Sequence, residues 1–129
     1  MTAIGRFGAL VLDCPDARVL GDFYRSVLGW EIAHTEPDWV DLRSPEGWAL
    51  AFQQVERHVA PVWPDADHPQ QAHLDIEVDD LEAAAKQVER CGARRHDVQP
   101  GSSFIVFVDP AGHPFCLVQA GSYLGSAAT

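Results

Sequence analysis

The residues best suited to chemistry lie around one histidine in the second half of the chain. His73, Asp75 and Glu77 alternate with apolar residues in the stretch Ala72–Val78. Alternate residues of an extended strand point to the same face, so these three side chains would share one face. An imidazole and two carboxylates on one face can bind a cation, hold a divalent metal ion, or transfer a proton as general acid or base.

The simplest interpretation of this trio is a polar cavity wall with ion pairs to Arg6. A metal centre built on the trio would need a second histidine to complete a His-carboxylate set. The candidates lie in regions where the sequence constrains position only weakly: His34, His58, His68, His96 and His113.

Charge and composition narrow the classes of partner. The chain has 129 residues, of which 47% are hydrophobic, enough for one domain with a real core. Nine basic residues against 19 acidic ones give a formal net charge of −10, which argues against nucleic acid or an anionic membrane as partner. We therefore expect a small-molecule partner.

The expected cellular compartment follows from targeting and cysteine patterns that are not found in the sequence. No apolar run approaches the ~18 residues of a membrane span, and the early run Gly8–Leu12, closed by Asp13, is too short for a signal-peptide core. Cys14, Cys91 and Cys116 form no close pair, so neither a disulfide framework nor a zinc knuckle is expected. These features favour a cytoplasmic protein.

Apolar spacing predicts two helices and eight strands. One helix begins after an Asp13 N-cap and stops at Gly29, and the other runs from an Asp79–Asp80 cap to Gly92. The strands are expected at Phe7–Leu12, Trp30–Thr35, Trp39–Arg43, Trp48–Gln53, Ala72–Val78, Ala93–Val98, Ser103–Val108 and Pro114–Gln119. Trp30 and Trp48, each next to a turn glycine, are expected in the core.

These elements repeat at half the chain length. Gly29 matches Gly92 at an offset of 63, while Pro45 matches Pro110 and Gly47 matches Gly112 at offsets of 65. Each half reads strand, helix, strand, strand, strand. We expect a single domain of two modules, at about 4–54 and 72–120, joined by a Pro-containing loop at about 55–71 and followed by a frayed tail at 121–129.

Several stretches carry a family resemblance: Phe23-Tyr24 with Leu28-Gly29-Trp30, the run from His73 to Leu81, and Asp109-Pro110-Ala111-Gly112-His113. With them the chain resembles the vicinal oxygen chelate superfamily, which includes glyoxalase I, bleomycin-resistance proteins, fosfomycin-resistance transferases and extradiol dioxygenases. The resemblance implies an α+β fold of two tandem βαβββ modules that form an incomplete barrel around a cavity. It also implies a homodimer.

Metal-using members of this superfamily place ligands on the first and last strands of each module, facing the cavity. Counted from Asp13, Asp80 and the two turn glycines, the implied positions are Arg6, Ala51, His73 and Cys116. His73 alone is an ordinary ligand, and a thiol is mostly protonated at neutral pH. We therefore expect no metal and no other cofactor.

The cavity then remains as a binding site. Its expected wall combines aromatic faces with carboxylates, which suits a planar or cationic molecule. The expected ligand-binding residues are Arg6, Trp39, Gln53, Trp63, His73, Asp75, Glu77, Phe104 and Cys116, with Gly8 and Asp41 beside them.

The first hypothesis is a metal-free protein that sequesters or senses a hydrophobic or cationic ligand. The alternative is a glyoxalase- or dioxygenase-type lyase, isomerase or oxygenase whose metal site is rebuilt around His73. Whether the chain is an enzyme stays open. His73 is a candidate general acid or base, and Cys116 would be its partner in a Cys–His pair if the superfamily's positions converge. A partner-binding module is a third class.

Overall fold

The computed structural model describes residues 3–123, in two units of one plan. The first unit ends at His58 and the second begins at Val59. The elements of the first are β1 (Leu10–Cys14), α1 (Ala17–Leu28), β2 (Glu31–Glu36), β3 (Trp39–Arg43) and β4 (Ala49–Gln54). The elements of the second are β5 (Leu74–Val78), α2 (Leu81–Cys91), β6 (Arg94–Arg95), β7 (Phe104–Val108) and β8 (Pro114–Gln119).

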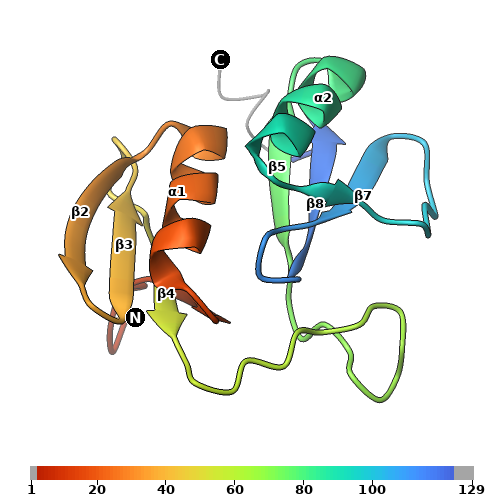
Figure 1. Ribbon diagram of the computed structural model, residues 1–129. Helices are drawn as coiled ribbons and strands as arrows, with labels where there is room; N and C mark the ends of the chain where they lie inside the picture. Colours follow the sequence, from red (N-terminus) through yellow and green to blue (C-terminus); the bar gives the residue numbers. More distant parts are fainter. Residues whose placement is uncertain (1–2, 124–129) are drawn as a thin grey trace. The chain divides into compact units, whose positions relative to one another are not determined.

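Each unit holds one four-stranded mixed sheet with one helix against it (Figure 1). The strand order is β1-β4-β3-β2 in the first sheet and β5-β8-β7-β6 in the second, so equivalent strands take equivalent places. The first and last strands of each module run parallel, and the other neighbours are antiparallel. The α+β class and the tandem βαβββ modules predicted from the sequence are confirmed.

The helices start and stop at residues that satisfy their free backbone groups. The Asp16 carboxylate accepts hydrogen bonds from the backbone N–H groups of Arg18 and Val19, at 3.0 and 3.1 Å. Asp80 accepts one from Ala83 at 3.1 Å. Gly29 ends α1 with a φ of 70°, a left-handed conformation that favours glycine.

The predicted cap at Asp13 is wrong by three residues. Strand β1 runs on to Cys14, so Asp13 still belongs to the sheet and Pro15 precedes the cap instead of opening the helix. The strand accordingly begins at Leu10 instead of Phe7. This shift changes which residues of the two modules correspond.

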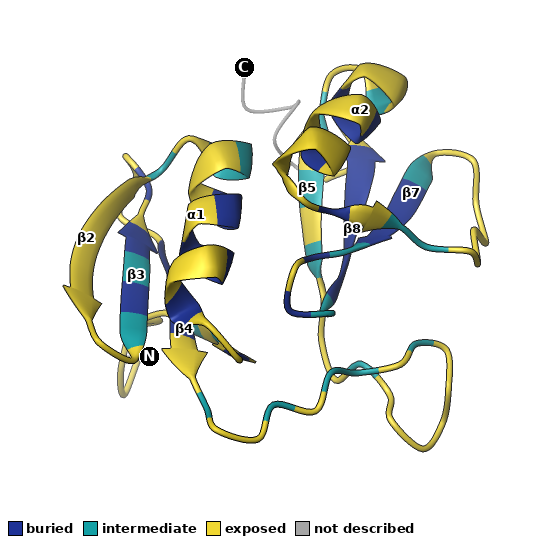
Figure 2. Ribbon diagram, in the orientation of Figure 1, coloured by how far each residue is buried: buried dark blue, intermediate teal, exposed yellow. Residues whose placement is uncertain are grey.

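The core of each unit lies between its helix and one face of its sheet (Figure 2). In the first unit, the Tyr24 ring on α1 stacks on Phe52 of β4, with centroids 5.6 Å apart. In the second, Phe107 of β7 stacks on Phe115 of β8 at 5.6 Å, and α2 contributes the small residue Ala85. Alternation along each strand sends the remaining residues to the opposite face.

The indoles of Trp30 and Trp48 are less covered than expected. Trp48 is 57% exposed, and its indole meets only the Phe7 ring edge-on at 6.0 Å among the ring contacts of the described residues. Trp30 is half-buried. A position beside a turn glycine therefore did not guarantee burial, because the turn itself lies at the surface.

Strand β6 is much shorter than the predicted Ala93–Val98. After Arg95 one further backbone hydrogen bond joins the chain to β7, from the His96 N–H to the Val106 carbonyl at 2.9 Å, and the Gln99 amide extends this pairing. Its Nε2 donates to the Val106 carbonyl and its Oε1 accepts from the Val106 N–H, each at 2.9 Å. The Gln99 side chain thus supplies hydrogen bonds to β7 where a longer strand β6 was predicted.

The last described residues contact the second sheet. The Gly121 N–H donates to the Glu77 carboxylate at 2.9 Å. Of the tail that we expected to be frayed, residues 124–129 lie outside the described part of the chain. Within the described part, neither helix has the length and apolar character needed to cross a membrane.

Candidate ligand-binding site

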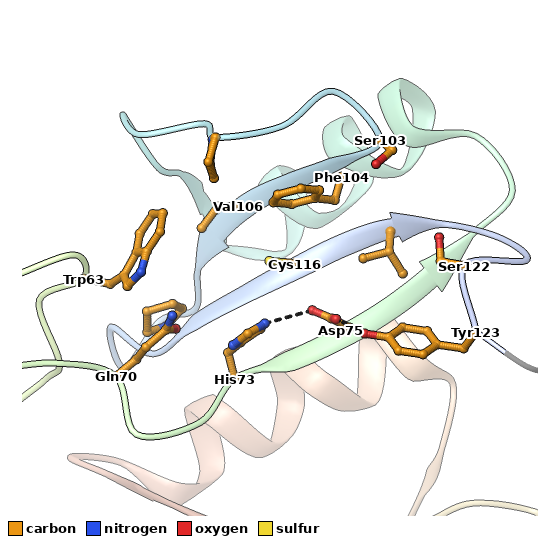
Figure 3. A pocket seen from close by; sticks show the side chains of 13 residues that line it. Trp63, Gln70, His73, Asp75, Ser103, Phe104, Val106, Cys116, Ser122 and Tyr123 are labelled. Carbon is orange, nitrogen blue, oxygen red and sulfur yellow. Dashed lines mark hydrogen bonds and ion pairs between the residues drawn. The ribbon is translucent and has the colours of Figure 1, made fainter.

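A pocket of about 470 Å³ lies in the second unit (Figure 3). The face of the sheet that lines it carries Asp75, Val106 and Cys116, while the intervening Phe115 and Leu117 of β8 are fully buried in the core. Register brings the lining residues together, because Cys116 pairs with Asp75 of β5 on one side and with Val106 of β7 on the other. The central strand β8 thus sets the floor of the pocket.

One side of the pocket is apolar. Trp63, from the loop before β5, and Phe104, from β7, pack against the buried cluster of Val106, Cys116 and Val118. The Trp63 indole also meets the His96 ring edge-on, with centroids 5.1 Å apart. These contacts hold two aromatic rings on one wall.

The other side is a hydrogen-bonded polar network centred on Asp75. His73 Nε2 lies 3.1 Å from Asp75 Oδ1, and the Tyr123 hydroxyl donates to Asp75 Oδ2. Both carboxylate oxygens are therefore engaged (Figure 3 shows the contact with His73). The hydrogen bond to Asp75 raises the pKa of Tyr123, because the carboxylate favours the protonated hydroxyl.

Cys116 is held as a neutral thiol. The residue is 7% exposed, and burial raises the pKa of its thiol from 9.0 to about 11, with the Asp75 charge and hydrogen bond adding to the effect. A thiol of that pKa is almost wholly protonated at neutral pH, so the arrangement disfavours Cys116 as the nucleophile of a Cys–His pair.

Gln70 supplies a polar atom with nothing to bind. Its Oε1 is buried at the pocket and has no hydrogen-bond partner in the part of the chain that the structure describes. A buried carbonyl oxygen without a donor costs about 1–3 kcal/mol. A ligand that donates a hydrogen bond there would recover that free energy.

The pocket brings together part of the set that the sequence singled out. The predicted residues that line it are Trp63, His73, Asp75, Phe104 and Cys116. Glu77 stays outside, because its carboxylate accepts the hydrogen bond from Gly121. Arg6, Trp39 and Gln53 belong to the first unit and do not line this pocket.

Eight lining residues were not predicted: Gln70, Pro100, Ser103, Val106, Pro114, Val118, Ser122 and Tyr123. Gln70 sits in a loop, and Ser122 and Tyr123 follow the last strand. Neither segment has a periodic pattern that would predict a facing direction. The only sequence signal was a single aromatic residue, Tyr123, in an otherwise small and polar tail.

The corrected helix cap also changes the correspondence between modules. Asp16 and Asp80 are 64 residues apart, so the counterpart of His73 is Ala9 and not Arg6. The counterpart of Asp75 is Val11, and Val11 pairs with Ala51 just as Asp75 pairs with Cys116. The first module therefore has the apolar side chains of Ala9, Val11 and Ala51 at the positions of His73, Asp75 and Cys116.

The residues present do not match the metal site of the superfamily, which draws ligands from both modules. One potential ligand atom each from His73, Asp75 and Cys116 lies within 4.8 Å of the others. All three belong to the second module, the Cys116 thiol is held protonated, and both Asp75 oxygens already accept hydrogen bonds. Ala9, Val11 and Ala51 offer no donor to complete the set.

Two βαβββ modules of identical strand order, one with a pocket on its sheet, define a protein of the vicinal oxygen chelate superfamily. Within that class, the chain belongs to the glyoxalase-like domain family, whose model matches residues 9–118. No curated protein matches the chain significantly by sequence.

Solved structures share the fold at low sequence identity. A glyoxalase/bleomycin resistance protein/dioxygenase family enzyme from Burkholderia phytofirmans is 14% identical, with a TM-score of 0.68 over 87% of this chain and 96% of that one. A glyoxalase/bleomycin resistance protein from Albidiferax ferrireducens is 16% identical, with a TM-score of 0.62 over 88% and 97%. The fosfomycin resistance protein FosX from Mesorhizobium loti is 15% identical, with a TM-score of 0.69 over 98% and 100%.

Proposed function

We propose that the chain binds a small molecule in the pocket of the second module without a metal ion, and so sequesters or senses it. The ligand has a planar apolar body and a group that is cationic or donates hydrogen bonds. The observation that carries the proposal is the division of the pocket into an aromatic wall and a side rich in acceptors.

The aromatic wall accounts for the apolar body. Trp63 and Phe104 present large faces whose burial against a ligand is favourable, by roughly 25 cal/mol for each Å² of apolar surface removed from water. A volume of about 470 Å³ lies within the range of about 300–1,000 Å³ typical of small-molecule pockets. The wall thus favours a ligand of one or two rings.

The opposite side accounts for the polar group. Asp75 brings a carboxylate into the pocket, with a side chain that is 22% exposed, and Gln70 adds its unpartnered carbonyl oxygen. Each Asp75 oxygen keeps a second lone pair beside the hydrogen bond that it already accepts, and the Gln70 oxygen has no donor, so a hydrogen-bond donor or a cation is recognised and an anion is repelled. Resistance proteins named among the structural neighbours share the fold, which supports a small-molecule role at the level of fold alone.

The alternative, a metal-dependent lyase, isomerase or oxygenase rebuilt around His73, finds less support. Its ligand set would be confined to one module and would need the Cys116 proton to leave. We therefore favour binding without a metal.

A series of ring compounds that differ only in charge tests the proposal. Benzylamine, benzyl alcohol and benzoate share one ring and differ in carrying a positive, zero or negative charge. We expect thermal unfolding of the full chain to shift upward most for benzylamine, less for benzyl alcohol, and not at all for benzoate, because a ligand that binds only the folded state stabilises it.

Two variants sharpen the result. Asp75→Asn should remove the preference for benzylamine over benzyl alcohol, whereas Phe104→Ala should weaken binding of both. Glu36→Gln, which alters an exposed carboxylate paired with His34 outside the pocket, is the matched control and should behave like the parent chain. Equal shifts for all three compounds, or none, would contradict the proposal.

A further inference from the structure

We infer that the pair His73–Asp75 is a general base that removes a proton from a ligand in this pocket, in a reaction that uses no metal ion. The inference rests on the proposed function, because the proton must come from a molecule bound against the aromatic wall. It adds an activity to that function, and it assigns His73 as a catalytic residue and Asp75 as the residue that positions it.

The geometry fixes which imidazole nitrogen can act. Asp75 Oδ1 lies 3.1 Å from His73 Nε2, and a carboxylate accepts, so the neutral ring carries its proton on Nε2. The lone pair is then on Nδ1. Within the described residues nothing bonds to Nδ1, and the side chain is 39% exposed at the pocket.

Among the titratable side chains that line the pocket, His73 is the one suited to act as the base. The other titratable side chains that line the pocket are Asp75 from β5, Cys116 from β8 and Tyr123 from the tail. Cys116 and Tyr123 have raised pKa values and keep their protons near neutral pH. Asp75 accepts hydrogen bonds on both oxygens. His73 therefore combines a free lone pair with access to the ligand.

Asp75 also stabilises the product of proton removal. When Nδ1 takes the proton, the ring becomes an imidazolium cation whose Nε2–H remains bonded to the carboxylate, as in other carboxylate–histidine pairs. The positive charge of the His73 imidazolium is thus balanced by the Asp75 carboxylate, and no further charged group is required to stabilise it.

The reaction class follows from this chemistry. The substrate carries a C–H bond made acidic by a neighbouring electron-withdrawing group. The proton moves to Nδ1, and the electron pair of the C–H bond enters the adjoining bond. The proton then returns to another atom of the ligand, giving an isomer, or goes to water as a leaving group departs with its electron pair. Neither course needs an oxidant, a reductant or a co-reactant.

The probe 5-nitrobenzisoxazole reports such a base directly. It is planar, neutral and aromatic, so it suits the wall formed by Trp63 and Phe104. When the base removes the proton from its ring C–H bond, the electron pair of that bond becomes the third bond of a nitrile. The N–O bond then breaks, and a coloured phenolate is released. The imidazolium then returns its proton to water, so atoms and charge balance.

Two pocket variants and one matched control separate the roles. His73→Gln should lower the rate by about 100-fold, the lower end of the usual contribution of a general base. Asp75→Asn should lower it less and change the pH profile of what remains, because the ring loses the group that fixes its tautomer.

His34→Gln is the control, because the chain contains a second pair of the same kind. His34 Nε2 lies 3.0 Å from Glu36 Oε2, again two residues along a strand, but this pair is exposed on β2 and does not line the pocket. The control should leave the rate unchanged. Circular dichroism of each variant shows that its fold is retained.

Binding of the unreactive analogue 5-nitroindazole is measured alongside, so that two failures are distinguished. If the analogue does not bind, both the proposed function and this inference fail. If it binds and the rate in His73→Gln equals that of the parent, the base inference alone is wrong. If Asp75→Asn abolishes the reaction while His73→Gln retains it, Asp75 is the base and the assignment is overturned.

Discussion

Asp75 joins the features of the pocket at the scale of single residues. Its two oxygens bind His73 and Tyr123, and its charge helps to keep the thiol of Cys116 protonated. The same carboxylate is the group that would select a cationic ligand and orient the imidazole. One side chain therefore links ligand selection to proton transfer, and substitutions around it should be informative.

The first prediction concerns Cys116. Because the neutral thiol is favoured in the folded state, the unfolded chain ionises first as the pH rises from 9.0 to about 11. The free energy of unfolding should fall across that window, by up to about 2 kcal/mol, since one pKa unit corresponds to about 1.4 kcal/mol. Denaturant titrations at several pH values measure this.

Cys116→Ala serves as the comparison, and its unfolding free energy should fall less over the same window. Alkylation gives a second readout at lower pH. The exposed Cys91 should react with iodoacetamide while the buried Cys116 stays unmodified in the folded chain. Rapid modification of Cys116 at neutral pH would show that the thiol is not protected.

The second prediction concerns divalent metals. The donors His73, Asp75 and Cys116 lie on one module, and their counterparts Ala9, Val11 and Ala51 add none. Equimolar Zn²⁺, Ni²⁺ or Mn²⁺ should therefore leave the unfolding temperature unchanged, and a chelator should not abolish benzylamine binding. A metal-dependent rise in that temperature, lost in His73→Gln, would contradict binding without a metal.

At the scale of elements, small shifts in boundaries carry over to the site. Apolar spacing correctly predicted Trp39–Arg43, Leu81–Cys91 and Pro114–Gln119 as elements, because local periodicity alone defines them. The boundary between β1 and α1 was misplaced, since Asp13 and Asp16 are both good caps and only strand pairing up to Cys14 decides between them. Because of this misplaced boundary, Arg6 was predicted to correspond to His73, whereas Ala9 occupies that position.

The third prediction tests the packing of α1 on its sheet. A Cβ added at Gly21 would lie 2.8 Å from Val40 Cγ1, whereas the equivalent position in α2 is the buried Ala85. Alanine has the better helix propensity by about 1 kcal/mol. Overpacking nevertheless costs about 1–3 kcal/mol, so Gly21→Ala should lower the free energy of unfolding.

The double variant Gly21→Ala/Val40→Ala should recover part of that loss relative to the sum of the single changes, because it removes the clashing methyl group. Urea titration of the four chains in this cycle gives the coupling. Strict additivity would mean that the two residues do not interact as the helix-to-sheet contact requires.

At the scale of the whole molecule, the net charge of −10 is the dominant property. It supports a cationic ligand by attracting positive charge, and this attraction weakens as salt screens it. The absence of nucleic acid or membrane partners and the cytoplasmic location remain predictions from the sequence.

The fourth prediction is the homodimer expected from the superfamily. Phe7 and Trp48 are 64% and 57% exposed and meet edge-on, which leaves an aromatic pair on the surface of the first unit. Sedimentation velocity at micromolar concentration should show a dimer, weakened by Phe7→Ser with Trp48→Ser. A monomer in the parent chain would contradict the expectation.

Local sequence patterns were sufficient to predict the repeated module and the common face of His73 and Asp75. Both follow from patterns within a few consecutive residues, which local backbone geometry translates directly into elements and facing directions. These patterns could not reveal that Gln70 and Tyr123 complete the pocket. Tyr123 reaches Asp75 across 48 residues of sequence, and such contacts arise only when strand pairing has brought distant segments together.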